Sequence, residues 1–250
     1  MRSIAVARLY RYPRLLQLVR HLRPSGSHTD HDSYARHLYQ AFGPHCTGGT
    51  TLEIGPGASL GTSALLARDG CRAFAMDLVD LRSPEQKSAL SAIDLNHAEV
   101  PYLLGNIEAM PFADQSFDFV FSNSCLEHVP DPARALSEIA RILRPGGRTA
   151  HQIDFRDHWH MEDPLRFLQY GDRLWRLMNR PGPGYQNRWR LSKYLEVFEG
   201  MGFDFEVEVN LVATDDQLRR AKRPRQALRD MTHDDLVTLS ARVVAHRRVT

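Results

Sequence analysis

The chain has 250 residues, of which 42% are hydrophobic and 25% are charged, as in ordinary globular proteins with a sizeable core. Its net charge is only +2, and its three cysteines form no C-x-x-C pair, which argues against a disulfide scaffold or a cysteine zinc site. The scattered cysteines fit a reducing, cytoplasmic setting, and no apolar run approaches the roughly 18 residues that a membrane span needs.

Residues 1–45 are predicted to be an N-terminal helical segment that precedes the main domain, 46–250. Within the segment, 9–22 suits either an amphipathic helix on a membrane surface or a helix packed on the domain. His28, Asp30, His31 and Asp32 resemble a metal cluster, but Asp32 also suits the N-cap of a helix over 34–42. No signal peptide is expected.

A glycine-rich turn follows the first predicted strand, 50–54. Gly55, Gly57 and Gly61 stand there, before a helix predicted over 63–68. The third glycine is one residue late for the dinucleotide fingerprint, so the glycines alone do not separate a dinucleotide from another adenosine-containing cofactor. Glu53, just before the turn, would repel a pyrophosphate and suits a positively charged cofactor such as S-adenosylmethionine.

Strands and helices then alternate along the chain. Further strands are predicted over 71–76, 102–104, 116–122 and 148–155, helices over 83–93, 131–143 and 193–201, and an antiparallel pair over 203–211 and 239–247. This alternation predicts an α/β fold with a doubly wound, mostly parallel sheet.

Several polar residues follow the ends of the predicted strands. Because ligands of such sheets bind outside the carboxyl ends of the strands, these residues should share one edge. Asp77 stands about 20 residues past the turn and suits either a ribose ligand or a strand-end cap. The other members are Glu53, Asn106, Asn123 and His128.

Five motifs in order make the chain resemble a class I S-adenosylmethionine-dependent methyltransferase of the ubiquinone-biosynthesis, or type 11, group. They are Glu53-Ile54-Gly55-Pro56-Gly57 with Asp77, the run 105–112, Ser116-Phe117-Asp118, Leu126-Glu127-His128-Val129 and 143–147. The resemblance implies a Rossmann-like sheet of seven strands with an antiparallel closing strand. Segments 151–158 and 184–192 are similar to a subgroup of bacterial polysaccharide or natural-product methyltransferases.

The resemblance also implies a set of cofactor-binding residues. Gly55 and Gly57 would line the methionine moiety, Asp77 the ribose, and Asn106 with Ile107 the adenine. Asn123 would close the pocket, and Glu53 and Leu78 complete the set. The sequence departs from the family at Asn106, where Asp is usual, and at Ser59, where Gly is frequent.

An acceptor-covering insertion is expected over 156–190, between the fifth strand and the next helix. Its aromatic residues could stack on an acceptor or form the insertion's own core. They are Trp159, Phe167, Tyr170, Trp175 and Tyr185.

Methyl transfer to a hydroxyl benefits from a base near neutral pKa, for which histidine is suited. We predict His151 as that base and His128 as the second candidate, with Asp154 orienting the base or binding an acceptor hydroxyl; either histidine could instead bond backbone at a strand end. No metal ligand is assigned. A divalent ion remains an alternative, because His151, Asp154, Asp157, His158, His160, Glu162 and Asp163 cluster in the sequence.

The predicted function is O-methylation of a small hydroxylated acceptor, such as a sugar or a glycosylated or polyketide-type natural product. Two alternatives stay open: an N- or RNA methyltransferase, although no N-P-P-Y motif follows the fourth strand, and a non-catalytic scaffold that binds the cofactor or has lost it. A charged segment, 215–229, suits a solvated helix or an RNA-binding strip; a nucleic-acid partner is not expected.

Overall fold

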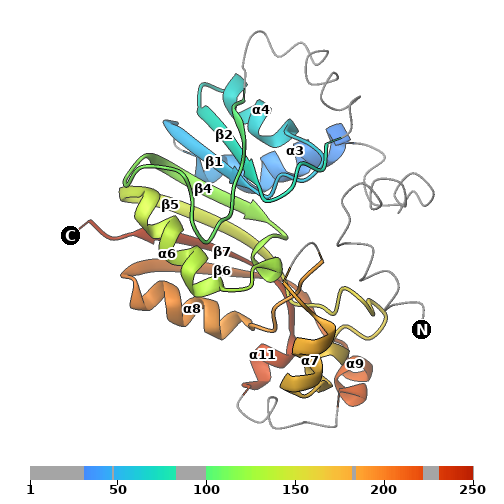
Figure 1. The fold of residues 1–250 in the computed structure, drawn as a ribbon. Helices are drawn as coiled ribbons and strands as arrows, with labels where there is room; N and C mark the ends of the chain where they lie inside the picture. The colour runs from blue at the N-terminus through green and yellow to red at the C-terminus, as the bar shows by residue number, and fades with distance from the viewer. Residues whose placement is uncertain (1–30, 47, 83–99, 182–183, 222–230, 250) are drawn as a thin grey trace.

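The computed structural model describes residues 31–46, 48–82, 100–181, 184–221 and 231–249. A seven-stranded sheet with the order β3-β2-β1-β4-β5-β7-β6 forms its centre (Figure 1). The strands are β1 (Thr50–Ile54), β2 (Arg72–Asp77), β3 (Tyr102–Leu104), β4 (Phe117–Asn123), β5 (Leu143–Asp154), β6 (Phe203–Val212) and β7 (Thr238–Arg247). Strands β1 to β5 pair in parallel, and β7 runs antiparallel to β5 and β6. The predicted fold class is therefore confirmed.

Helices cover both faces of the sheet (Figure 1). On one face lie α3 (His31–Phe42) and α4 (Gly61–Arg68), and α3 continues into the short helix η1 (Gly43–His45). Leu38 and Phe42 of α3 form a hydrophobic cluster with Phe119 and Phe121 of β4. On the other lie α6 (Pro132–Ile142) and α8 (Leu191–Gly200), which share the main core with β1, β4 and β5. Strand β4 is buried on both faces from Phe119 to Ser122, which explains why Phe119, Val120 and Phe121 are all apolar.

Most predicted elements lie within a few residues of those observed. Helix α4 begins at Gly61, two residues before the predicted start, and β5 begins at Leu143, ahead of the predicted 148. Helix α8 begins at Leu191 with Arg190 as its N-cap, and Ser192 bonds the carboxylate of Asp235 through both its amide and its hydroxyl. The predicted helices over 9–22 and 83–93 lie outside the described residues, as do His28 and Asp30 of the suggested metal cluster.

Beyond the sheet lies a small cap built from two parts of the chain. Segment 156–190 supplies η3 (Arg166–Gln169) and α7 (Asp172–Met178), and the β6–β7 connection supplies α9 (Asp215–Arg220) and α11 (His233–Val237). Figure 1 shows α7, α9 and α11 grouped together. Trp175 is 5% exposed and packs against Trp159, with the ring centroids 5.2 Å apart. Four of the insertion's aromatic residues, Trp159, Phe167, Tyr170 and Trp175, therefore pack in the core of the cap, and Tyr185 is not part of that cluster.

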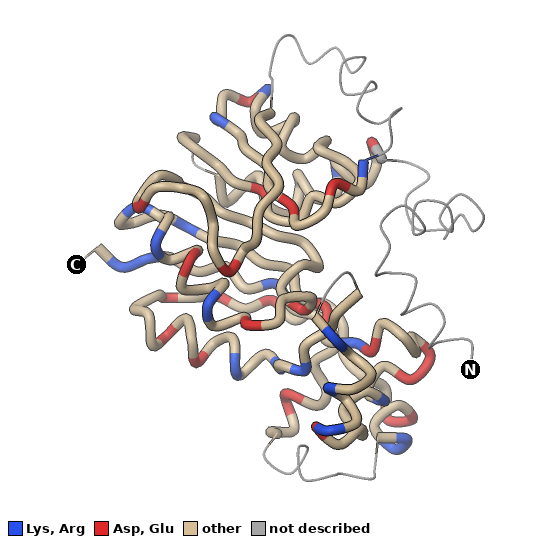
Figure 2. The backbone as a smooth tube through the Cα atoms, viewed as in Figure 1, with Lys and Arg blue, Asp and Glu red and all other residues tan. Residues whose placement is uncertain are grey.

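Charges of both signs are mixed along the described chain (Figure 2). In α9, Arg219 and Arg220 both pair with Asp216, which fits a solvated helix better than an RNA-binding strip. Among the helices that the structure describes, none has the length and apolar character to cross a bilayer.

Candidate active site

The glycine turn leaves β1 at the carboxyl edge of the sheet. Gly55 and Gly57 have φ values of 69° and 66°, which side chains other than glycine rarely adopt. A Cβ atom at Gly55 would lie 3.0 Å from the sulfur of Cys125, whereas one at Gly57 would meet nothing within 4 Å. The backbone at Gly55 thus packs against Cys125, whereas the space beside Gly57 is open, so that a ligand can approach the backbone there.

Glu53 lies beneath this turn and is only 3% exposed. The hydroxyl of Ser63, in the first turn of α4, donates a hydrogen bond of 2.5 Å to its carboxylate. Burial raises the pKa of Glu53 to about 7, and the bond from Ser63 opposes part of that shift. Glu53 is therefore close to its protonation midpoint at neutral pH, so a cationic cofactor nearby would favour its charged form.

Asp77 joins the end of β2 to the glycine turn. Its carboxylate accepts hydrogen bonds from the amides of Gly57, at 3.1 Å, and Val79, at 3.5 Å. Burial raises the pKa of Asp77, and these amide bonds counteract the shift. Asp77 caps its strand end in this geometry, and the next residue, Leu78, has its side chain 60% exposed at the same edge.

The remaining predicted cofactor residues lie on the neighbouring strand ends. Asn106 is exposed and accepts a bond of 2.9 Å from the amide of Glu108, while Ile107 is 8% exposed and belongs to the core. Asn123 donates a bond of 2.7 Å to the hydroxyl of Tyr34. Tyr34 comes from α3, and no sequence pattern links it to a site nearly 90 residues later in the chain.

His151 lies inside the sheet layer and is fully buried. Its Nδ1 lies 2.7 Å from the hydroxyl of Ser122, and its Nε2 lies 2.6 Å from that of Thr149. Because Thr149 donates its proton to the carbonyl of Val120, it accepts from Nε2, and Ser122 donates to Nδ1. Burial lowers the pKa of His151 to about 3. Both nitrogens are occupied, which does not favour the predicted role as base.

His128 occupies a different environment, at the end of the short helix η2 (Leu126–His128) that follows β4. Its Nδ1 lies 2.6 Å from the carbonyl oxygen of Tyr185, so Nδ1 carries the proton and Nε2 keeps its lone pair. Burial and the neighbouring ring of His158, with centroids 4.9 Å apart, lower the pKa of His128 to about 4. His128 is therefore neutral at physiological pH, with one nitrogen available to a ligand.

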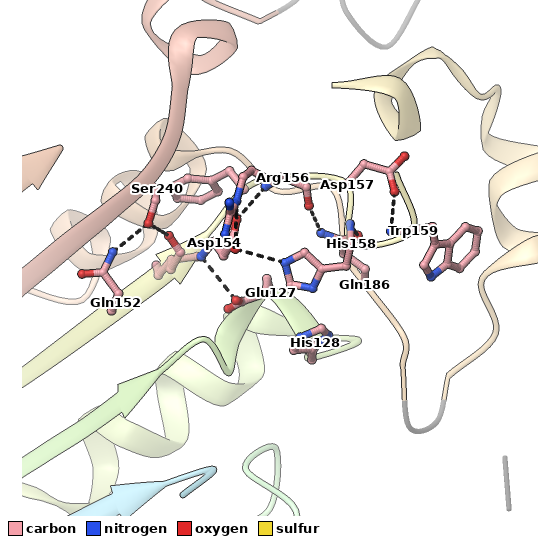
Figure 3. A network of polar contacts seen from close by, with 12 residues as sticks. Glu127, His128, Gln152, Asp154, Arg156, Asp157, His158, Trp159, Gln186 and Ser240 are labelled. Atoms are coloured by element: carbon pink, nitrogen blue, oxygen red, sulfur yellow. Dashed lines mark hydrogen bonds and ion pairs between the residues drawn. The ribbon is translucent and has the colours of Figure 1, made fainter. Parts of the chain in front are cut away.

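Asp154 and its neighbours complete a polar cluster beside His128 (Figure 3). Asp154 forms an ion pair of 2.6 Å with Arg156 and lies 3.4 Å from Nε2 of His158. Burial opposes ionisation, but His158 and Arg156 hold the pKa of Asp154 below its ordinary value. The amide of Asp154 donates to Glu127, which is 2% exposed and whose pKa is raised well above its ordinary value by burial. We call Glu127, His128, Asp154, Arg156 and His158 the acceptor-side cluster.

The residues that could hold a metal differ from those suggested by the sequence. Within the described ranges, Glu127, His128 and His158 each place one ligand atom within 4.8 Å of the others. His151 is held in the sheet, and His160 is turned toward Asp157, with Nδ1 3.2 Å from its carboxylate. The motif Leu126-Glu127-His128-Val129 was recognisable in the sequence, but nothing there indicated that His158 would meet it.

Comparison with known proteins places this geometry in context. Residues 52–150 match the family model described as a methyltransferase domain. The chain is 31% identical over 116 residues to a probable S-adenosylmethionine-dependent methyltransferase of Mycolicibacterium smegmatis, covering 46% of this chain and 42% of the relative. An uncharacterized protein of a Streptomyces fradiae transposon is 38% identical over 97 residues, or 39% of this chain and 27% of that protein. The chain thus spans well under half of these relatives.

Solved structures share the fold. A methyltransferase from Methanosarcina mazei has a TM-score of 0.59 at 18% identity, covering 85% of this chain and 99% of that one. A phosphoethanolamine methyltransferase from Haemonchus contortus, solved with S-adenosyl-L-methionine, has a TM-score of 0.53 at 19% identity, covering 87% and 53%. Residues 52–150 accordingly match a methyltransferase domain, and the family and this relative support S-adenosylmethionine as the cofactor.

The named substrates of the relatives are diverse. They include a phosphoethanolamine N-methyltransferase of Caenorhabditis elegans, a sterol 24-C-methyltransferase of Gibberella zeae, an arsenite methyltransferase of Halobacterium salinarum and an O-methyltransferase of Aspergillus sclerotiorum. The acceptor atom is therefore to be sought in the chain's own site.

Proposed function

We propose that this chain is an S-adenosylmethionine-dependent O-methyltransferase whose acceptor is a small hydroxylated molecule, such as a sugar or a glycosylated or polyketide-type natural product. The observation that carries the proposal is the acceptor-side cluster, in which the neutral His128 keeps a free nitrogen beside the buried carboxylates of Glu127 and Asp154. A hydroxyl must give up its proton to become a good nucleophile, whereas a neutral amine carries its lone pair already. A site with proton-accepting groups suits the hydroxyl.

We place the cofactor at the carboxyl edge of the sheet beside the acceptor-side cluster, where β1 and β2 end. S-adenosylmethionine supplies the methyl group as a sulfonium, with positive charge that disappears during transfer. We place its methionine part over the open backbone at Gly57, its ribose at Asp77 and its adenine between Leu78 and Ile107, with Asn106 and Asn123 at the rim. Glu53 would balance the positive charge from beneath the turn. The chain then mainly aligns the reactants, because in-line displacement depends on geometry.

Within the cluster, we assign His128 to the acceptor hydroxyl. The carbonyl of Tyr185 fixes its tautomer, and Asp154 orients His158 and Arg156 around the same space. Nε2 of His128 would accept the proton of the hydroxyl, and the acceptor oxygen would take the methyl group as the bond to sulfur breaks and its electron pair stays on sulfur. His151 supports the sheet beneath, through Ser122 and Thr149.

Calorimetric titration with S-adenosylmethionine tests the cofactor site. We expect wild-type binding, and a loss of at least about tenfold in affinity for Asp77→Ala, equal to about 1.4 kcal/mol. Asp80→Ala is the matched control: Asp80 lies three residues away and pairs with Arg82, so this variant should keep its affinity. Absence of binding by the wild type would contradict the enzyme and favour a scaffold.

Incubation with methyl-labelled cofactor tests the acceptor class. Pairs of acceptors that differ only in a hydroxyl or an amine should give the labelled methyl ether in preference to the methylamine, with no label on RNA. Label found only on amines or on RNA would overturn the proposal of O-methylation while leaving cofactor binding intact.

A further inference from the structure

One oxygen of the acceptor-side cluster, Oε2 of Glu127, is enclosed by protein without a hydrogen-bond partner among the described residues. Glu127 is only 2% exposed, and its other oxygen already accepts the amide of Asp154 at 3.3 Å. Nε2 of His158 is enclosed as well and makes no hydrogen bond, with the carboxylate of Asp154 3.4 Å away. Buried polar groups are paired in nearly all native structures, so the unpaired oxygen of Glu127 indicates a ligand that the described residues do not supply.

The charges of the cluster indicate the sign of that ligand. Arg156 is engaged by both carboxylate oxygens of Asp154, with contacts of 2.6 to 3.1 Å. This pair neutralises Asp154, and among the residues that the structure describes Glu127 forms no ion pair with a lysine or arginine. A buried carboxylate is costly unless it is paired or coordinates a metal, so the missing partner should be a cation.

The two histidines are arranged as metal ligands are. His128 donates from Nδ1 to the carbonyl of Tyr185 at 2.6 Å, which leaves the lone pair of Nε2 available to a ligand. Metal-binding histidines use this arrangement, in which the second nitrogen donates to a carbonyl or carboxylate. The His158 ring stands between Asp154 and His128 (Figure 3), so its position is fixed from the opposite side.

We propose that Glu127, His128 and His158, whose ligand atoms lie within 4.8 Å of one another, bind a divalent transition-metal ion of the zinc class. Two imidazoles and one carboxylate form a donor set of catalytic zinc sites, in which a further position stays open. Resting on the proposed function, we assign that position to the acceptor hydroxyl. The ion would lower the pKa of the hydroxyl, its proton would pass to solvent, and the oxygen would then attack the methyl carbon.

Zn²⁺ titration of untagged, chelator-treated protein tests the site without any acceptor. We expect a single tightly bound ion per chain, and at least about tenfold weaker binding for Glu127→Gln and for His158→Asn. The chain has 12 histidines, any of which could bind Zn²⁺ weakly, so a control is needed. It is His160→Ala, which removes a histidine of the same segment whose ring is turned toward Asp157. That variant should bind Zn²⁺ as the wild type does.

Two further measurements keep the test independent of folding and of the proposed function. Co²⁺ bound to the wild type should show the intense visible absorption of a tetrahedral site, which needs no variant. Titration with S-adenosylmethionine should give unchanged affinity for all three variants, because the substituted residues lie outside the cofactor site. If the wild type binds Zn²⁺ but not S-adenosylmethionine, the proposed function fails while the metal site stands.

Three outcomes would overturn the metal site. The wild type could bind no Zn²⁺. Zn²⁺ binding could persist unchanged in Glu127→Gln and His158→Asn, which would mean that surface histidines alone bind the ion. Finally, His160→Ala could abolish Zn²⁺ binding. In each case intact cofactor binding would leave the proposed methyl transfer standing, with His128 acting on the hydroxyl directly.

Discussion

Two histidines, His151 within β5 and His128 in the short helix after β4, differ in burial and in hydrogen bonding. His151 is fully buried, and both its nitrogens are bonded to hydroxyls of its own sheet. His128 is partly exposed and uses only Nδ1, toward Tyr185. The same side chain thus supports the fold at one position and faces a ligand at the other, because the hydrogen bonds available around each ring differ.

This contrast makes a prediction for the two alanine variants. His151→Ala leaves a cavity and an unpaired Ser122, so its free energy of unfolding should fall by about 2–4 kcal/mol, measured in urea, while the folded enzyme retains turnover. His128→Ala should remain within about 1 kcal/mol of the wild type, since the ring is partly exposed, and lose at least about a hundredfold in turnover. An inactive but stable His151→Ala would restore His151 as the base.

At the level of elements, the close contact of α3 with α4 decides how the glycine turn is covered. A Cβ atom at Gly61 would lie 2.5 Å from the Cβ of Ala35, and the amide of Gly61 donates to Ser59 at 3.1 Å. The late third glycine therefore allows the two helices to approach, and α3 in turn brings Tyr34 to Asn123 at the edge of the site.

Gly61→Ala should consequently destabilise the protein, although alanine is favoured over glycine inside a helix. We expect a loss of about 1–3 kcal/mol from the overlap, and a weaker affinity for S-adenosylmethionine as α3 moves away. Ala35→Gly is the compensating change, since it removes the opposing Cβ. If the double variant is no more stable than Gly61→Ala alone, the contact with Ala35 is not the reason for the glycine.

In the whole molecule, one buried arginine connects the cap to the sheet. Arg190 is 3% exposed and donates to the carbonyls of Phe155, Asp235 and Thr238, at 2.6, 2.8 and 2.5 Å. Phe155 directly follows β5, Asp235 belongs to α11, and Thr238 begins β7. Burial lowers the pKa of Arg190 to about 10, which still leaves it charged at neutral pH. Both segments of the cap therefore depend on the same side chain.

Arg190→Met should loosen the two segments together. Three buried carbonyls lose their donor, so we expect a loss of at least about 3 kcal/mol and faster hydrogen exchange in 156–190 and 231–237 than in β1 and β4. Arg219→Met is the matched control, because Arg219 is exposed and its contact with Asp216 is 3.8 Å, so it should change stability by less than about 0.5 kcal/mol. Faster exchange confined to one segment would mean that the cap is not one unit.

The sequence by itself determined the sheet, the glycine turn and the cofactor. Strand and helix periodicities are local, and parallel strands separated by helices place their carboxyl ends on one edge, so Glu53, Gly57 and Asp77 could be grouped from their positions alone. The family motifs depend on the same local order.

Only the tertiary structure decided which side chains face the acceptor. Whether His151 is enclosed depends on hydroxyls from β4 and β5, and the meeting of Glu127 and His128 with His158 depends on the path of the chain into the cap. Likewise, the reason for a glycine at position 61 became visible only from the position of Ala35. Contacts between residues far apart in sequence arise from packing, which local patterns do not encode.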